Sequence, residues 1–233
     1  MRTRNILPSG MILAIVIAAA FKFADAQTAP REPDAKHGAD IVAHGTAAGA
    51  PPCETCHSVN GNPDGSGTFP RLFALPAYYL AKQLTDYKAG TRTNDIMRPI
   101  AQMLSADDIA DLAAFYAVAN APLPSLAAPD PALVAAGQQL AIVGNAAKAV
   151  PACDNCHGPG GTGLPPAIPP LAGQFAPYVV SELQLWQRGI RKNDGGAQMS
   201  DLVQRLDKRD IAAVAAYYQQ VKSALPASAA PAK

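Results

Sequence analysis

Two copies of one short motif organise this sequence: Cys53-Glu54-Thr55-Cys56-His57 and Cys153-Asp154-Asn155-Cys156-His157. Together the two motifs use all 4 cysteines of the chain. The spacing Cys-x-x-Cys-His is the attachment pattern of a c-type haem. On a helical turn, residues three and four apart lie on one face, so both thiols and the imidazole of each motif can point at the same ligand. The sequence therefore predicts two covalently attached haem c groups, with His57 and His157 as iron ligands.

Two other uses of paired cysteines are weaker. A Cys-x-x-Cys pair is half of a zinc site, and the two pairs together offer four thiolates to one metal ion. That alternative leaves the adjacent histidines and the repeated methionines unexplained. A redox dithiol of the thioredoxin type needs a βαβ context, and no segment of this chain has the alternating pattern of a strand. Because haem attachment accounts for every cysteine, we expect no disulfide and no free thiol.

The rest of the chain is a tandem duplication. With Leu72 set against Leu171, the following residues run in step. The matched pairs are Tyr79 with Tyr178, Leu84 with Leu183, Tyr87 with Trp186, Gly90 with Gly189, Arg92 with Arg191, and Asn94-Asp95 with Asn193-Asp194. A short insertion follows in the second copy, after which Met97 meets Met199 and Asp108-Ile109 meets Asp210-Ile211. One fold is therefore present twice.

Each copy is predicted to be helical. Pro76 stands at the start and Gly90 just past the end of a segment whose apolar residues recur at helical spacing. Ser105 followed by Asp108 resembles a capping box before a second apolar face, and Asp207 occupies the matching place in the second copy. The predicted fold class is all-α.

The ends of the chain and the junction between the copies differ in composition from the repeats. Residues 1–26 have the basic start, short apolar run and small-residue cleavage site of a signal peptide, which implies export to the periplasm. The apolar run is short for a membrane span of about 20 residues, although an uncleaved anchor is the alternative. We assign 27–36 to an N-terminal tail, 37–120 to the first domain, 121–131 to a Pro-rich linker, 132–223 to the second domain and 224–233 to a C-terminal tail.

Net charge excludes one class of partner. The chain has 19 basic and 18 acidic residues, and removal of the predicted signal peptide leaves 16 and 17. A nucleic-acid-binding protein would show a basic patch or stripe, and none is visible here.

The sixth iron ligand is predicted from the repeat. A thioether is a soft, neutral donor, and Met/His ligation raises the potential of c-type haems. Met97 and Met199 occupy matched positions, so we assign Met97 to the first iron and Met199 to the second. Met103 aligns with Arg205 and is interpreted as core filler. His37 and His44 align with Ala136 and Val143, and are interpreted as surface histidines of the first helix.

At this level the chain resembles a dihaem class I cytochrome c of the cytochrome c4 type. The resemblance rests on the paired haem motifs, Leu171-Ala-Gly-Gln174, the Arg-x-Asn-Asp segments at 92–95 and 191–194, and the closing helices. It implies two tandem helical domains, each wrapped around one haem, with the haems near the domain interface. It also implies that the carbonyls of Pro70 and Pro169 orient the ligating histidines, and that Gly38 and Gly137 let the first helix cross the last.

The repeats also depart from one another. Phe73-Ala-Leu75 stands where the second copy has Ala-Gly-Gln, and the first methionine loop is shorter, so we expect the haem potentials to differ. The Arg, Asn and Asp before each methionine either bind haem propionates, brace the loop, or are surface charges without a role. These alternatives stay open from the sequence.

The resemblance implies a periplasmic carrier of single electrons, from a quinol-oxidising complex or a dehydrogenase to a terminal oxidase. The alternative is a tightly bound cytochrome subunit of a periplasmic dehydrogenase complex. A dihaem peroxidase-type enzyme is a third interpretation, which needs an open iron position and is disfavoured by two matched methionines. We therefore expect redox proteins as partners, and membrane contact only through them or through an uncleaved anchor.

Overall fold

The computed structural model describes residues 31–58, 69–121 and 126–222. The compact unit that begins at Pro33 contains both repeats. The predicted signal peptide and C-terminal tail lie outside the described residues, as do residues 122–125 of the linker. Within the described ranges, no helix is both long enough and apolar enough to cross a membrane.

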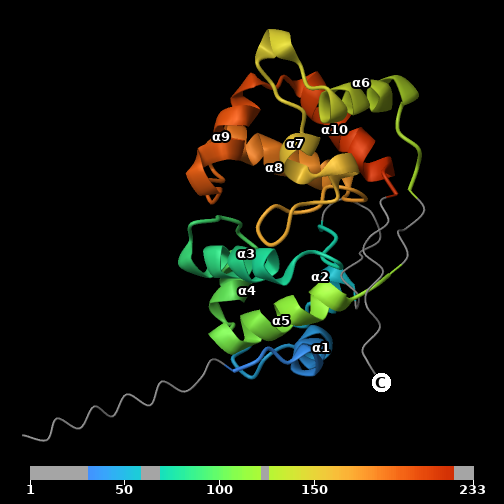
Figure 1. The fold of residues 1–233 in the computed structure, drawn as a ribbon. Coiled ribbons are helices and arrows are strands. Elements are labelled where there is room, and N and C mark those ends of the chain that lie inside the picture. The colour runs from blue at the N-terminus through green and yellow to red at the C-terminus, as the bar shows by residue number, and fades with distance from the viewer. Residues whose placement is uncertain (1–30, 59–68, 122–125, 223–233) are drawn as a thin grey trace, which may run out of the picture. The chain divides into compact units, whose positions relative to one another are not determined.

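Helices make up the regular structure of both repeats (Figure 1). The first repeat contains α1 (Ala35–His44), α2 (Glu54–His57), α3 (Ala77–Ala89), α4 (Met97–Gln102) and α5 (Ala106–Val118). The second contains α6 (Pro131–Ile142), η1 (Ala146–Lys148), α7 (Asp154–His157), η2 (Pro159–Gly161), α8 (Ala176–Gln187), η3 (Gly195–Ala197), α9 (Gln198–Leu202), η4 (Val203–Arg205) and α10 (Lys208–Gln220). Extended pairing in the described part of the chain is limited to two isolated bridges. The all-α prediction is confirmed.

In each repeat the first helix crosses the last at a glycine. Helix α1 packs on α5, and α6 packs on α10. A Cβ atom on Gly38 would lie 2.2 Å from the carbonyl oxygen of Asp111, and one on Gly137 would lie 2.0 Å from that of Ala213. Any larger residue would push the two backbones apart, so the predicted role of both glycines is confirmed.

The predicted helix ends are present as well. Pro76 precedes α3, and Gly90 ends it in the left-handed conformation with φ 81°. Ser105 and Asp108 form a reciprocal capping box at α5, and Asp207 and Asp210 form one at α10. These caps satisfy backbone N–H groups that have no partner inside the helix.

Two helix bounds differ from the segments we assigned to the tail and the linker. Helix α1 begins at Ala35, because the side chain of Asp34 accepts from the backbone N–H groups of Lys36 and His37. Helix α6 begins at Pro131, with Asp130 as its cap. In both cases an aspartate in a Pro-rich stretch starts the helix earlier than the apolar pattern indicates.

Each repeat has its own hydrophobic core. The first is formed by buried residues of α1, α3 and α5, including Ile41, Leu80 and Leu112. The second is formed by the equivalent helices and includes Leu183 and Val214. Partly buried Cys53 and Cys153 pack against these two clusters, so each motif lies at the edge of a core.

Candidate functional site

Each Cys-x-x-Cys-His motif forms one short turn of helix. The backbone N–H of His57 donates to the carbonyl of Cys53 at 2.9 Å, and His157 donates to Cys153 at the same distance. The chain leaves the turn at Ser58 and Gly158, both with positive φ. His57 and His157 are buried, with 7% and 8% exposure. Both motifs therefore present cysteines and a buried imidazole on one turn, as their spacing predicts.

A proline carbonyl fixes the orientation of each imidazole. The Nδ1 atom of His57 lies 3.3 Å from the carbonyl oxygen of Pro70, and that of His157 lies 2.9 Å from the oxygen of Pro169. Because a carbonyl can only accept, Nδ1 carries the proton and donates. Burial lowers the pKa of both imidazoles, so each stays neutral at pH 7 with an unprotonated Nε2. An unprotonated ring nitrogen is what a metal ligand requires.

The cysteines of the two motifs do not converge on one point. Burial raises the pKa of Cys53 and of Cys153 to about 11, which keeps both as neutral thiols at pH 7. Cys156 is exposed. In the described ranges, no three His, Cys, Asp or Glu side chains are grouped so that they could hold a metal ion. The shared four-cysteine arrangement that we considered for zinc is not found among these residues.

The methionines fall into two environments. Met199 lies on α9 and packs against the second core. Met97 is the first residue of α4 and is partly exposed, and its backbone N–H donates to the side chain of Asn94 at 2.9 Å. Met103 packs against the first core together with Cys53, which agrees with its interpretation as core filler.

The two extra histidines lie on α1. His37 is half exposed, and its Nδ1 lies 2.7 Å from the fully buried carboxylate of Asp111. His44 is exposed and bonds to Asp40 on the same helix. The surface interpretation therefore holds for His44, whereas His37 also ties α1 to α5.

The Arg-x-Asn-Asp segments are not surface charges, so that alternative was wrong for their arginines. Arg92 and Arg191 are buried, and both pair with the same carboxylate of Glu182, at 3.0 and 2.6 Å. Asp194 accepts from the backbone and hydroxyl of Ser200, which braces the loop before α9. These bonds also lower the pKa of Asp194, although its partial burial acts in the opposite direction.

Sequence reasoning missed a buried cation that joins the repeats. Arg71 is fully buried, and its guanidinium donates to the carbonyls of Phe73 and of Ala172. Its backbone pairs twice with the Gln174 side chain, each bond 3.0 Å long. Burial lowers the pKa of Arg71 to about 10, so it is still charged at pH 7. The sequence held one signal for this contact. Arg71 aligns with Pro170 and Gln174 aligns with Leu75, so neither residue belongs to the repeated pattern.

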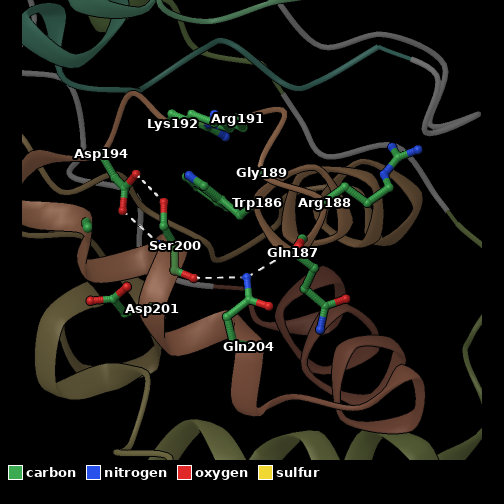
Figure 2. Close-up of a pocket in the computed structure, with 11 residues that line it drawn as sticks. Trp186, Gln187, Arg188, Gly189, Arg191, Lys192, Asp194, Ser200, Asp201 and Gln204 are labelled. Atoms are coloured by element: carbon green, nitrogen blue, oxygen red, sulfur yellow. Dashed lines mark hydrogen bonds between the residues drawn. The ribbon is translucent and has the colours of Figure 1, made fainter.

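Several buried donors near these sites are unpartnered. Trp186 Nε1, Tyr116 OH and Arg71 Nε are each buried without a hydrogen-bond partner among the described residues. The Cζ atom of Arg191 lies 3.8 Å from the ring centroid of Trp186. Trp186 also lines a cavity of about 540 Å³, together with Lys192 and Asp194 (Figure 2). Buried donors of this kind need an acceptor. Haem propionates supply acceptor oxygens, so the residues present fit the predicted cofactor.

Comparison with known proteins agrees with this arrangement. The family model for cytochrome c matches residues 134–222. Cytochrome c4 of Pseudomonas aeruginosa is 39% identical over 185 residues, which cover 78% of this chain and 90% of that protein. A protein of Stutzerimonas stutzeri named thiosulfate dehydrogenase electron acceptor is 37% identical over 169 residues, covering 72% of this chain and 78% of the relative.

Solved structures show the same likeness in three dimensions. Reduced cytochrome c4 from Pseudomonas stutzeri superimposes with a TM-score of 0.71 at 33% identity, covering 81% of this chain and 99% of that one. The thiosulfate dehydrogenase TsdBA from Marichromatium purpuratum gives a TM-score of 0.74 at 37% identity. There the match covers 80% of this chain and 40% of the longer chain.

Proposed function

Because the chain belongs to the cytochrome c4 family of dihaem, class I c-type cytochromes, we propose that it carries single electrons in a periplasmic respiratory chain. Electrons would arrive from a quinol-oxidising complex or a dehydrogenase and leave to a terminal oxidase. Haem c supplies the chemistry, since its iron takes up and releases one electron. The export signal that the proposal needs is the segment 1–26, which lies outside the described residues.

The observation that carries the proposal is the matched pair of oriented imidazoles. In both repeats Nδ1 donates to a proline carbonyl, which leaves Nε2 available as an iron ligand. Cys53 and Cys56 would hold the first haem, and Cys153 and Cys156 the second. The hydrogen bond from Nδ1 would hold each imidazole in position during electron transfer and increase its basicity as a ligand.

The proposed sixth ligands are Met97 and Met199. Asn94 supports this assignment, because its side chain holds the backbone N–H of Met97 at the start of α4. Asp194 similarly braces the loop before Met199 through Ser200. Met103 has no methionine counterpart in the second repeat, where Arg205 takes its place, so the repeat supports Met97. Two closed irons favour a carrier over a peroxidase-type enzyme, which needs an open position.

Carbon monoxide tests these ligands, because it binds ferrous haem only where a position is open. We expect the absorption spectrum of the reduced, haem-loaded protein to be unchanged by carbon monoxide. Met97→Ala and Met199→Ala should each make about half of the haem reactive. The matched control Met103→Ala should stay unreactive. A reactive wild-type protein would favour the enzyme interpretation, and a reactive Met103→Ala variant would contradict the assignment of Met97.

A second candidate function is that of a dedicated electron acceptor, or bound subunit, of a dehydrogenase. Relatives named as thiosulfate dehydrogenase electron acceptors support it, as does the likeness to part of the TsdBA chain. Purified thiosulfate dehydrogenase with thiosulfate would be mixed with the oxidised cytochrome, and reduction followed by absorbance. Rapid reduction with co-elution on size exclusion would favour the subunit, and reduction without co-elution the free carrier. No reduction would exclude this enzyme as the donor.

A further inference from the structure

The side chains where the two repeats meet form one buried polar group, here called the inter-repeat cluster. It comprises Tyr79, Gln83, Arg92, Tyr178, Glu182, Arg191 and Asn193. Arg92 donates to Tyr178 OH across the repeats at 3.0 Å, and Arg191 reaches Tyr79 OH at 3.5 Å. Each arginine thus contacts the tyrosine of the opposite copy. The cluster therefore has an approximate two-fold pattern.

One pair of residues breaks this pattern. Gln83 and Glu182 are equivalent in the repeat, and each contacts both arginines. Glu182 Oε2 accepts a hydrogen bond from Arg191 Nη1 at 2.6 Å and forms an ion pair with Arg92 Nη2 at 3.0 Å. Gln83 Oε1 accepts from Arg92 Nη1 at 2.8 Å and Arg191 Nη2 at 3.3 Å. A neutral amide therefore stands where a second carboxylate would complete the pattern.

The side chains of the cluster therefore carry an excess positive charge in a buried place. The side chains of Arg92, Arg191 and Glu182 are 5%, 6% and 10% exposed, so two guanidiniums share one carboxylate. The neighbouring charges, Lys82 and Asp86, pair with each other and cancel. Salt screens a buried charge much less than an exposed one, so its field extends further through the protein.

We propose that the Gln83/Glu182 pair tunes the reduction potentials of the two haems. This inference rests on the proposed electron-carrier function. Reduction adds one negative charge to a haem, and a buried positive charge favours that state. Neutral Gln83 keeps the excess charge in place, whereas the carboxylate of Glu182 limits it to one. These residues act through their field and do not touch the iron.

Two variants test the proposal by moving the charge in opposite directions. Gln83→Glu adds a carboxylate between two arginines and should lower both midpoint potentials. Glu182→Gln removes the carboxylate that pairs with both arginines and should raise both midpoint potentials. We expect each change to alter the equilibrium constant for reduction by about threefold to tenfold, where tenfold corresponds to 59 mV for one electron. The potentials are read from a redox titration of the haem absorption bands.

A matched control separates the effect of a buried charge from that of the same substitution on the surface. Gln184→Glu makes the same substitution on α8 at an exposed position. At 0.5 M salt, where surface charges are screened, it should change the equilibrium constants for reduction of both haems by less than a factor of about 1.5. The effect of Gln83→Glu should persist at that salt concentration. Loss of its effect, or an effect equal to that of the control, would overturn the proposal.

The sign of the shift distinguishes tuning from simple damage. Loss of packing would shift both variants in one direction, and that result would also overturn the proposal. If Glu182→Gln does not fold because two buried arginines lack a carboxylate, the comparison of Gln83→Glu with Gln184→Glu still tests the proposal. Carbon monoxide is added to every variant. Unreactive irons with unshifted potentials would refute the tuning alone, whereas reactive wild-type irons would refute the carrier function.

Discussion

Replacement of Gly137 by alanine gives the sharpest test of how the second repeat is assembled. The added Cβ would lie 2.0 Å from the carbonyl oxygen of Ala213 and 2.8 Å from Cβ of Tyr217, where ordinary contacts begin at 3.4 Å. Helices α6 and α10 would have to separate by about 1.4 Å at the crossing to relieve the overlap. Both neighbouring atoms belong to the backbone or to a Cβ, so neither can rotate away.

The cost follows from these distances. Overpacking typically costs about 1–3 kcal/mol, and a backbone clash belongs at the upper end, about 3 kcal/mol. Alanine is the better helix former by about 1 kcal/mol, which leaves a net loss of about 2 kcal/mol. The compact unit that begins at Pro33 has about 200 residues, for which that loss corresponds to a fall of roughly 4–8 °C in melting temperature.

The assay is thermal unfolding of the haem-loaded protein, followed by far-UV circular dichroism. Gly195→Ala is the matched control, because nothing lies within 4 Å of the Cβ it would add. We expect the control to stay within about 0.5 kcal/mol of the wild-type protein. Equal melting temperatures for the Gly137→Ala and Gly195→Ala proteins would refute the close crossing.

Two further predictions concern stability. The hydrogen bond from Lys148 lowers the pKa of Asp207 to about 2, so its charge stabilises the fold above pH 4 and this contribution is lost as the pH falls towards 2. Asp207→Asn keeps an oxygen to cap α10 but cannot ionise. The free energy of unfolding of this variant should therefore fall less steeply than that of the wild-type protein between pH 4 and pH 2, and an equal slope would contradict this. Ala74 has φ 56° where the second repeat has Gly173, and both donate to the closing helix of their repeat. Ala74→Gly should relieve strain and stabilise the first repeat by about 0.5–1 kcal/mol, and a lower melting temperature would contradict that expectation.

Most features of the fold were predictable from local sequence patterns. The motif turns, the caps at Ser105 and Asp207, and the left-handed end at Gly90 all depend on residues a few positions apart. Helices α1 and α6 begin inside the segments assigned to the tail and the linker, because the aspartate caps Asp34 and Asp130 start each helix before the apolar pattern does. The repeat assigned Met97 to the first iron and Met103 to core filler, and the structure adds that Met103 packs against the first core whereas Met97 is partly exposed at the start of α4.

The sequence by itself determined the two haem motifs, the duplication and the helical class, because each is encoded in spacing along the chain. Only the tertiary structure decided that Arg92 and Arg191 are buried against Glu182, and that Arg71 is held by Gln174. The physical reason is that burial depends on which surfaces meet. Arg92 pairs with Glu182 and Arg71 with Gln174, each in the other repeat and about a hundred residues away, and no local pattern records these contacts.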